Sequence, residues 1–81
     1  MPLVLETLTR VSKIICSVLD EERSIDLNTV AADFDGWDSL GNIRVFLALE
    51  EEFGIEFTTH EVTHLSNVGS LIEAIDSKGK Q

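Results

Sequence analysis

The feature that most constrains the fold is a repeat of apolar residues at every third or fourth position near the start of the chain. From about Leu3 to Leu19, the apolar positions of this repeat are Val4, Leu8, Val11, Ile15 and Val18. At about 100° of rotation per residue, these side chains share one narrow arc of a helix. The opposite side carries the polar and charged residues Glu6, Arg10, Lys13 and Ser17. This pattern predicts an amphipathic helix.

The length and charge of the chain limit what can surround this helix. With 81 residues, the chain has room for one domain, residues 1–81, because a domain usually needs about 50 residues or more. The net charge of −9 disfavours nucleic acid and anionic membranes as partners and favours basic protein surfaces. No apolar run is long enough for a membrane span or follows a basic leader, so we expect a soluble, cytoplasmic protein. The single cysteine, Cys16, excludes an intramolecular disulfide and fits a reducing compartment.

The segment from about residue 21 to residue 38 loses the helical period but keeps a series of apolar residues. These residues are Ile25, Leu27, Val30, Phe34 and Trp37. We expect a long loop that these side chains pin to the core, with one short turn around Asn28–Ala31. Asp35-Gly36 is a turn signal, and Asp38 is suited to cap the helix that follows.

The second predicted helix, from about Ser39 to Phe53, has two apolar stripes. One stripe, which can face the core, consists of Val45, Phe46, Leu49 and Phe53. The other lies about 120° away on the helix and consists of Leu40, Ile43 and Leu47. This second stripe is flanked by Arg44, Glu50 and Glu51, so part of it should reach solvent as a partner-binding surface. The alternative is a helix buried between two neighbours.

Two shorter helices are predicted after Gly54, which is suited to end the second helix. Thr58-x-x-Glu61 has the spacing of a capping box, which predicts a short helix at about Thr59–His64. Asn67 can cap a last helix with a buried stripe of Val68, Leu71, Ile72 and Ile75. Gly79 is expected past its end, with residues 78–81 as a frayed tail. The predicted fold is all-α, with three main helices and a short third helix.

Residues 60–64 read His-Glu-Val-Thr-His, which matches the H-E-x-x-H pattern of zinc metalloproteases. Such a site needs a longer helix, a cleft and further zinc coordination, none of which this sequence provides. Glu61 already has a structural role in the predicted capping box. We therefore expect the match to be coincidental, with no metal site and no catalytic residue.

Ser39 lies in the first turn of the second helix, behind Asp38. At that position, unpaired backbone N–H groups and the positive end of the helix dipole favour an attached phosphate. A nucleophilic serine would need a base and an oxyanion hole, and the G-x-S-x-G turn is absent. The position therefore favours a phosphoryl ester on Ser39 over catalysis by it.

The segment Trp37-Asp38-Ser39-Leu40-Gly41, followed by Ile43, Val45, Phe46, Leu49 and the run from Glu50 to Ile55, resembles the acyl carrier protein family. The resemblance covers nearly the whole chain, and the length, acidity and helix order agree with it. It implies a four-helix bundle of the acyl-carrier type, with the long loop between its first two helices. It also implies that a phosphopantetheinyl transferase attaches 4′-phosphopantetheine from coenzyme A to Ser39, beside Asp38 and Leu40. The thiol of that arm would carry an acyl group as a thioester.

The same resemblance implies roles for other residues and for partner proteins. The second helix would be the recognition helix, with contacts from Leu40, Ile43, Arg44, Leu47, Glu50 and Glu51. The acyl chain would fold back between the second and third helices, against Phe46, Phe57, Val62 and Leu65. The carrier is expected to be a non-catalytic monomer. Its further partners would be an acyl- or aminoacyl-loading ligase or transferase and downstream synthase enzymes.

Several positions depart from the pattern of fatty-acid carriers. Gly41 and Arg44 stand where acidic residues are usual, and Thr58, Thr59 and His60 replace an acidic start of the third helix. These departures, and Trp37 before the serine, favour a polyketide, nonribosomal or cell-surface pathway over housekeeping fatty-acid synthesis. Two alternatives stay open. One is a peptidyl or aminoacyl carrier of the same fold, and the other is an unmodified helical adaptor that binds partners through the Leu40, Ile43 and Leu47 stripe.

Overall fold

The computed structural model describes residues 3–65 and 67–79, with the backbone alone described at residues 3–5 and 79. Four α-helices and one short 3-10 helix make up its regular structure in these residues. In chain order they are α1 (Leu3–Leu19), η1 (Ala31–Asp33), α2 (Ser39–Phe53), α3 (Thr59–His64) and α4 (Val68–Gly79). The predicted all-α fold and the predicted bounds of the first three α-helices are confirmed.

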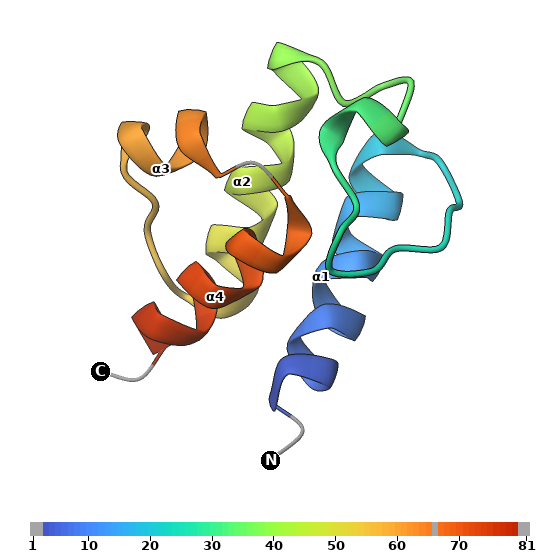
Figure 1. The fold of residues 1–81 in the computed structure, drawn as a ribbon. Coiled ribbons are helices and arrows are strands. Elements are labelled where there is room, and N and C mark those ends of the chain that lie inside the picture. The colour runs from blue at the N-terminus through green and yellow to red at the C-terminus, as the bar shows by residue number, and fades with distance from the viewer. Residues whose placement is uncertain (1–2, 66, 80–81) are drawn as a thin grey trace.

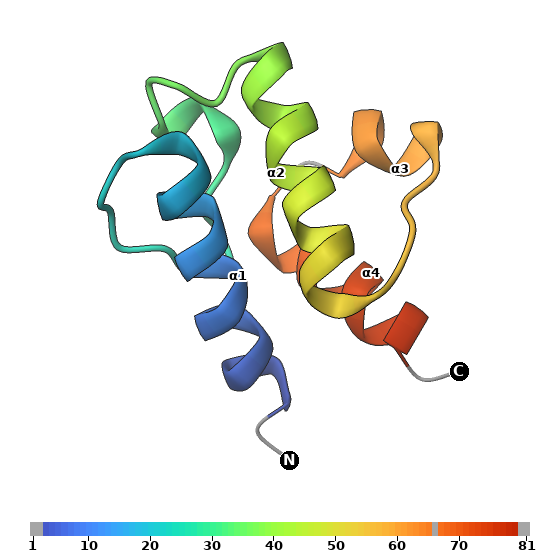
Figure 2. The same ribbon diagram turned by 180° about the vertical axis from the view of Figure 1, so that it is seen from behind.

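The helices form a small bundle in which α1 packs against both α2 and α4, and α3 packs against α2. Helix α1 runs in the opposite direction to α2 and α4, and α3 lies across the side of the bundle (Figure 1). The loop between α1 and α2 arches beside the end of α1 before it reaches the start of α2, as the reverse view also shows (Figure 2). The start of α2 is therefore at the opposite end of the bundle from the start of α1 and the end of α4 (Figure 1).

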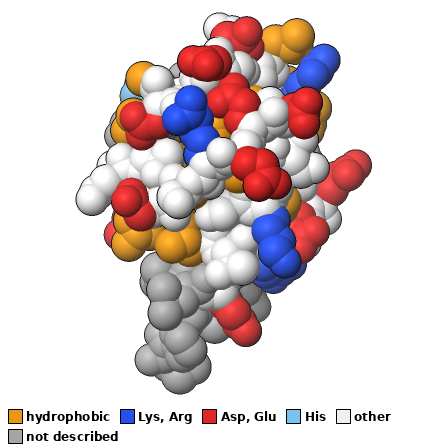
Figure 3. Space-filling model, turned by 90° about the vertical axis from the view of Figure 1, so that its right-hand side faces the viewer, with side chains coloured by type: hydrophobic (Ala, Val, Ile, Leu, Met, Phe, Trp, Pro, Cys, Tyr) orange, Lys and Arg blue, Asp and Glu red, His pale blue; other side chains and the backbone are white. Residues whose placement is uncertain are grey.

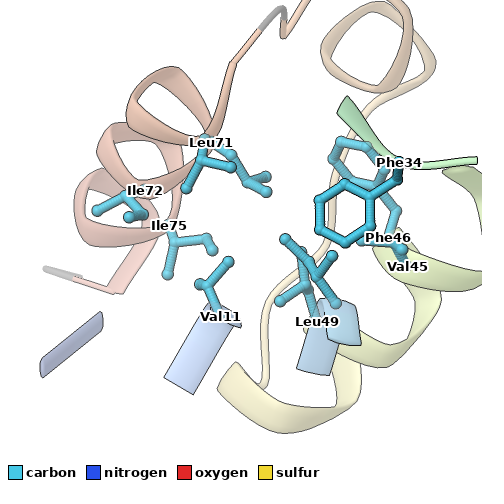
Figure 4. Close-up of a cluster of buried hydrophobic side chains, with 10 residues drawn as sticks. Val11, Phe34, Val45, Phe46, Leu49, Leu71, Ile72 and Ile75 are labelled. Atoms are coloured by element: carbon cyan, nitrogen blue, oxygen red, sulfur yellow. The ribbon is translucent and has the colours of Figure 1, made fainter. Parts of the chain in front are cut away.

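The core is one cluster of apolar side chains from α1, α2, α4 and the loop. Phe34 from the loop lies close to Phe46 of α2, and both face the side chains of α4 across the interior (Figure 4). The buried members are Val11, Ile15, Phe34, Val45, Phe46, Leu49, Val68, Leu71, Ile72 and Ile75. These include the predicted buried stripe of the last helix and most of the first stripe of the second helix. Val4, which was predicted in the first stripe, has a side chain outside the described part.

The long loop is held to the start of α4 by its backbone as well as by its side chains. The amides of Val68 and Gly69 donate to the carbonyl oxygens of Thr29 and Leu27, both at 2.9 Å. Phe34 is 4% exposed, as its predicted role as an anchor requires. Leu27 does not anchor through its side chain, because that side chain is 42% exposed and its carbonyl makes the contact instead. The predicted short turn around Asn28–Ala31 is two successive turns in the structure, one closed by a hydrogen bond from the Thr29 amide to the Asp26 carbonyl oxygen at 3.1 Å and the other formed by η1.

The helix ends follow the predicted capping chemistry, with one exception. Gly54 ends α2 in the left-handed conformation, with φ of 65°. The Thr58 hydroxyl and the Glu61 carboxylate form the predicted reciprocal capping box at the start of α3. The exception is the end of α4, which includes Lys78 and Gly79 rather than stopping before a frayed tail. Lys78 is held by an ion pair with Glu61, with an N···O distance of 2.8 Å, and Lys80 and Gln81 lie outside the described residues.

Two residues of α2 test this packing, because they have the same side chain in opposite surroundings. Leu49 is fully buried and Leu47 is 58% exposed. Leu49→Ala should lower the free energy of unfolding by about 2–5 kcal/mol, since it leaves a cavity in the core. Leu47→Ala should change it by less than about 0.5 kcal/mol. Urea unfolding followed by circular dichroism measures both, and equal losses in the two variants would contradict the orientation of α2.

Candidate functional site

Ser39 is an exposed side chain in the first turn of α2, at one end of the bundle. The carboxylate of Asp38 caps this turn, because its Oδ1 accepts a hydrogen bond from the Gly41 amide at 2.8 Å. The Asp38 carbonyl oxygen accepts from the Asn42 amide, also at 2.8 Å. The first turn of α2 contains no acidic residue. Ser39 is thus held on a rigid helix start whose dipole favours a negative group.

Glu21 fixes the loop that leads to Ser39. Its two carboxylate oxygens accept hydrogen bonds from the backbone amides of Gly36 and Asp35, at 2.7 and 3.3 Å. The Arg23 guanidinium forms an ion pair with the same carboxylate at 3.2 Å. Partial desolvation raises the pKa of the Glu21 carboxyl, but these hydrogen bonds and the Arg23 charge outweigh it and lower the pKa below its ordinary value of 4.5. An acid at the end of α1 therefore sets the path of the chain just before the serine.

Gly41 allows the start of α2 to lie close to the preceding turn. A Cβ atom at this position would collide with the carbonyl oxygen of Gly36 and would lie 3.1 Å from the Leu19 side chain. The acidic side chain that fatty-acid carriers usually have here could not fit without a shift of the backbone. The departure at Gly41 is thus tied to the local packing of this chain.

Trp37 and Asn42 form a polar contact next to Ser39. The indole Nε1 of Trp37 donates to Asn42 Oδ1 at 2.8 Å, and Asn42 Nδ2 donates to the Val62 carbonyl oxygen at 3.4 Å. The indole ring also packs edge-to-face on Phe34, with ring centroids 5.5 Å apart. One amide side chain therefore connects the loop, α2 and α3.

The predicted exposed stripe of α2 is confirmed as a solvent-facing surface. Leu40, Ile43 and Leu47 are 59%, 51% and 58% exposed, so α2 is not buried between two neighbours. Arg44, which is also exposed, stands within this stripe. The four side chains lie on the helix that Ser39 begins, and the surface extends away from Ser39 along α2.

The acidic run at residues 50–52 has three different environments. Glu50 accepts a hydrogen bond from the Phe57 amide at 2.8 Å, which ties the end of α2 to the connection before α3. Glu52 forms an ion pair with Arg10 of α1 at 2.9 Å. Glu51 is exposed, and among the described residues its carboxylate has no hydrogen-bond or ion-pair partner. Other acidic side chains are scattered over the face that α1 and the loop present, with few basic ones between them (Figure 3).

The residues predicted to form an acyl pocket are brought together only in part. A cavity of about 40 Å³ is lined by Phe46 and Leu65, as predicted. Phe57 packs edge-to-face on Phe46, with centroids 4.8 Å apart, and neither Phe57 nor Val62 lines the cavity. The remaining lining residues are Thr29, Val30, Ala31, Trp37, Asn42, Asn67 and Leu71.

The His-Glu-Val-Thr-His segment forms α3, and its side chains are engaged with one another and with α4. The rings of His60 and His64 stack with centroids 4.0 Å apart, and His64 Nδ1 lies 2.9 Å from the His60 carbonyl oxygen. The hydrogen bond from Lys78 and that from the Thr58 amide lower the pKa of Glu61. The described residues contain no group of three or more side chains arranged to hold a metal ion.

Comparison with known proteins agrees with this site. A family model described as the phosphopantetheine attachment site matches residues 9–75. An acyl carrier protein of Caulobacter vibrioides is 34% identical over 74 residues, which cover 90% of this chain and 95% of that protein. The solution structure of holo acyl carrier protein from Geobacter metallireducens matches with a TM-score of 0.82 and 34% identity, over 96% of this chain and 86% of that one. A chain in the structure of the ishigamide ketosynthase/chain length factor matches with a TM-score of 0.70 and 29% identity, over 94% of this chain and 97% of that one.

The chain belongs to the acyl carrier protein family. It is a carrier of acyl groups rather than a catalyst, and its cofactor is a covalently attached phosphopantetheine. In the described residues, no helix is long and apolar enough to cross a membrane.

Three residues that shape the site have roles that sequence reasoning missed. Asn42 could have been noticed, because it shares the buried arc of α2 with Val45, Phe46 and Leu49 while being polar. The contact of Glu21 with Gly36 gives no signal in the sequence, because the two residues are fifteen positions apart in irregular chain. The same holds for the close approach at Gly41.

The lowered pKa of Glu21 predicts how the stability of the site depends on pH. Because the folded state lowers this pKa, the stabilisation from Glu21 is complete above the unfolded pKa near 4.5 and is lost as the pH falls through the lower folded value. At pH 7 the urea midpoint of Glu21→Gln should therefore lie below that of wild type. The difference between the two midpoints should narrow as the pH falls below about 4.5. Glu22→Gln, at the exposed neighbour, is the matched control. If the difference in urea midpoint between Glu21→Gln and wild type stays constant down to pH 3, the prediction is wrong.

Proposed function

We propose that Ser39 is the residue that carries phosphopantetheine, with Asp38 and Leu40 as its immediate neighbours. The observation that carries the proposal is the exposed hydroxyl of Ser39 in the first turn of α2, inside the segment that the phosphopantetheine family model matches. A transferase that uses coenzyme A can reach this hydroxyl without moving any part of the bundle.

The residues around Ser39 fit the group. A phosphodiester on the serine would lie at the positive end of the α2 dipole, where the first backbone N–H groups have no partner within the helix. Arg44, one turn further along α2, is the nearest basic residue in sequence. When bound, the arm ends in a thiol that carries the acyl group as a thioester. The chain itself presents the arm at the tip of a rigid bundle, so that the cargo reaches partner enzymes at a high effective concentration.

The surface formed by Leu40, Ile43, Arg44, Leu47 and Glu51 is the proposed docking surface for those enzymes. Glu50 was predicted to belong to it, but its carboxylate is engaged by the Phe57 amide. Arg44 and Glu51 are seven residues apart, so they lie on the same side of α2 and about 10 Å apart along its axis. The surface therefore has a positive half next to Ser39 and a negative half beyond it. An enzyme with an apolar patch, an acidic residue facing Arg44 and a basic residue facing Glu51 would fit it.

The partners we propose are a phosphopantetheinyl transferase, a loading ligase or transferase, and downstream synthase enzymes of a specialised cytoplasmic pathway. The match to a chain in a ketosynthase/chain length factor structure supports a polyketide-type pathway. So does Arg44, which breaks the acidic surface that a housekeeping synthase would contact. The whole chain, residues 1–81, would act as one monomeric carrier domain, with no catalytic role for the His60–His64 motif. An aminoacyl cargo would use the same Ser39 chemistry.

The first test of this proposal is modification of Ser39. Incubation with a promiscuous phosphopantetheinyl transferase and coenzyme A should raise the intact mass by one phosphopantetheine, and Ser39→Ala should abolish the gain. Ser77→Ala, at an exposed serine of α4, should be modified like wild type. If wild type gains no mass, or if Ser39→Ala still gains it, the assignment is wrong, and a helical adaptor that binds through the Leu40, Ile43 and Leu47 stripe becomes the better reading.

The docking surface is tested by reversing its two charges separately. Arg44→Glu and Glu51→Lys should each raise the KM of a downstream synthase for the loaded carrier by about two- to five-fold, as expected for loss of a solvent-exposed ion pair. The effect should shrink in high salt, because the contacts are screened. Glu73→Gln, at an exposed position on α4, serves as the control. A lower KM for Arg44→Glu would show that the partner faces this position with a basic residue.

A further inference from the structure

A small cavity between the loop, α2 and α4 is bordered by aromatic side chains from the loop and from α2. Trp37 and Asn42 line it, and they are two and three residues from Ser39 in sequence. Phe46, one turn beyond Asn42, also lines it and is 5% exposed. The Phe57 ring packs against Phe46 and supports it from the connection before α3. The cavity of about 40 Å³ holds a few non-hydrogen atoms at most.

The indole of Trp37 is fixed on two sides. Its Nε1 donates to Asn42 Oδ1 at 2.8 Å, and its ring packs edge-to-face on the buried Phe34, at an interplanar angle of 72°. The indole therefore has both a polar and an apolar contact that oppose its rotation. Movement of the ring would break a short hydrogen bond and an aromatic pair together.

Asn42 is also held on two sides. Its amide accepts from the indole and donates to the Val62 carbonyl oxygen, so it bridges the loop and α3. No buried side-chain nitrogen or oxygen atom in the described residues lacks a hydrogen-bond partner. Displacing the indole would leave the Asn42 oxygen without its donor beside Phe46 and Leu65, which is unfavourable in apolar surroundings.

We propose that the Trp37–Asn42 pair is a specificity-determining gate that limits the acyl group this carrier encloses to short chains. The inference rests on the proposed attachment at Ser39, because an acyl chain that folds back from it into this cavity would contact Trp37 and Asn42, which line the cavity. One water takes about 30 Å³, so a cavity of about 40 Å³ takes about two carbon atoms, and an acetyl group fits without moving the indole. The distal part of a longer chain stays in solvent, where partner enzymes can bind it directly.

A series of acyl groups on Ser39 tests the gate. Acetyl, butanoyl, hexanoyl and octanoyl pantetheine arms are loaded onto wild type, Trp37→Phe and Asn42→Ala, and the melting temperature of each is compared with that of its own acetyl form. The melting temperature of wild type should not rise from the acetyl form to the octanoyl form. Both variants lack the Trp37–Asn42 hydrogen bond, so their octanoyl forms should melt at least about 4 °C higher than their acetyl forms, because they bury several methylene groups. Glu73→Gln is the matched control and should behave like wild type.

The fluorescence of Trp37 gives a second readout, because it is the single tryptophan of the chain. Its emission in wild type should be the same with acetyl and octanoyl arms. A wild-type melting temperature that climbs steadily to octanoyl, or an emission shift with chain length, would overturn the proposal. A melting temperature that does not change with chain length in both variants would also overturn it, since the gate would then not be Trp37 and Asn42. Failure to load Ser39 is seen beforehand as an unchanged mass, and it would contradict the proposed function rather than the gate.

Discussion

The contact on which the rest of the structure depends is the packing of α1 against α2. Val11 and Ile15 from α1 and Val45 and Leu49 from α2 are all fully buried, and α4 covers them from the third side. The helices packed against α2 cover only part of its circumference. The opposite side of α2 therefore stays in solvent with its apolar residues exposed, and this exposed side is the one available to partner proteins.

A group of polar contacts fixes the start of this packed helix around Ser39, the proposed attachment residue. Glu21 holds the turn before the serine, and Asp38 caps the first turn of α2. Asn42 then links that turn to Trp37 and to α3. These contacts come from segments that are up to 20 residues apart in sequence. They hold the backbone around the serine while its own side chain remains exposed, which suits the attachment role proposed for it.

The sequence was most informative where the structure depends on neighbouring residues. Helical period and capping residues predicted α1, α2 and α3 at their observed bounds, because Asp38, Gly54 and the Thr58–Glu61 box act within a few residues of themselves. The end of α4 was misjudged because Lys78 is held by Glu61, which is seventeen positions earlier. The hydrogen bonds from the start of α4 to the carbonyl groups of Leu27 and Thr29 were likewise not predicted, because they join segments about 40 residues apart.

The sequence by itself determined the helices, the second apolar stripe of α2 and the resemblance that pointed to Ser39, because these depend on residue order and local periodicity. The tertiary structure decided how the residues of the candidate site are arranged and which of them are engaged by other parts of the chain. Glu50 accepts a hydrogen bond from the Phe57 amide and Glu52 pairs with Arg10, whereas Glu51 is exposed. Phe57 and Val62 do not line the cavity. The tertiary structure also joined Trp37 to Asn42 beside that cavity. Such pairings depend on how the helices pack in space, and the spacing of residues along one helix does not fix which side chains of other elements they meet.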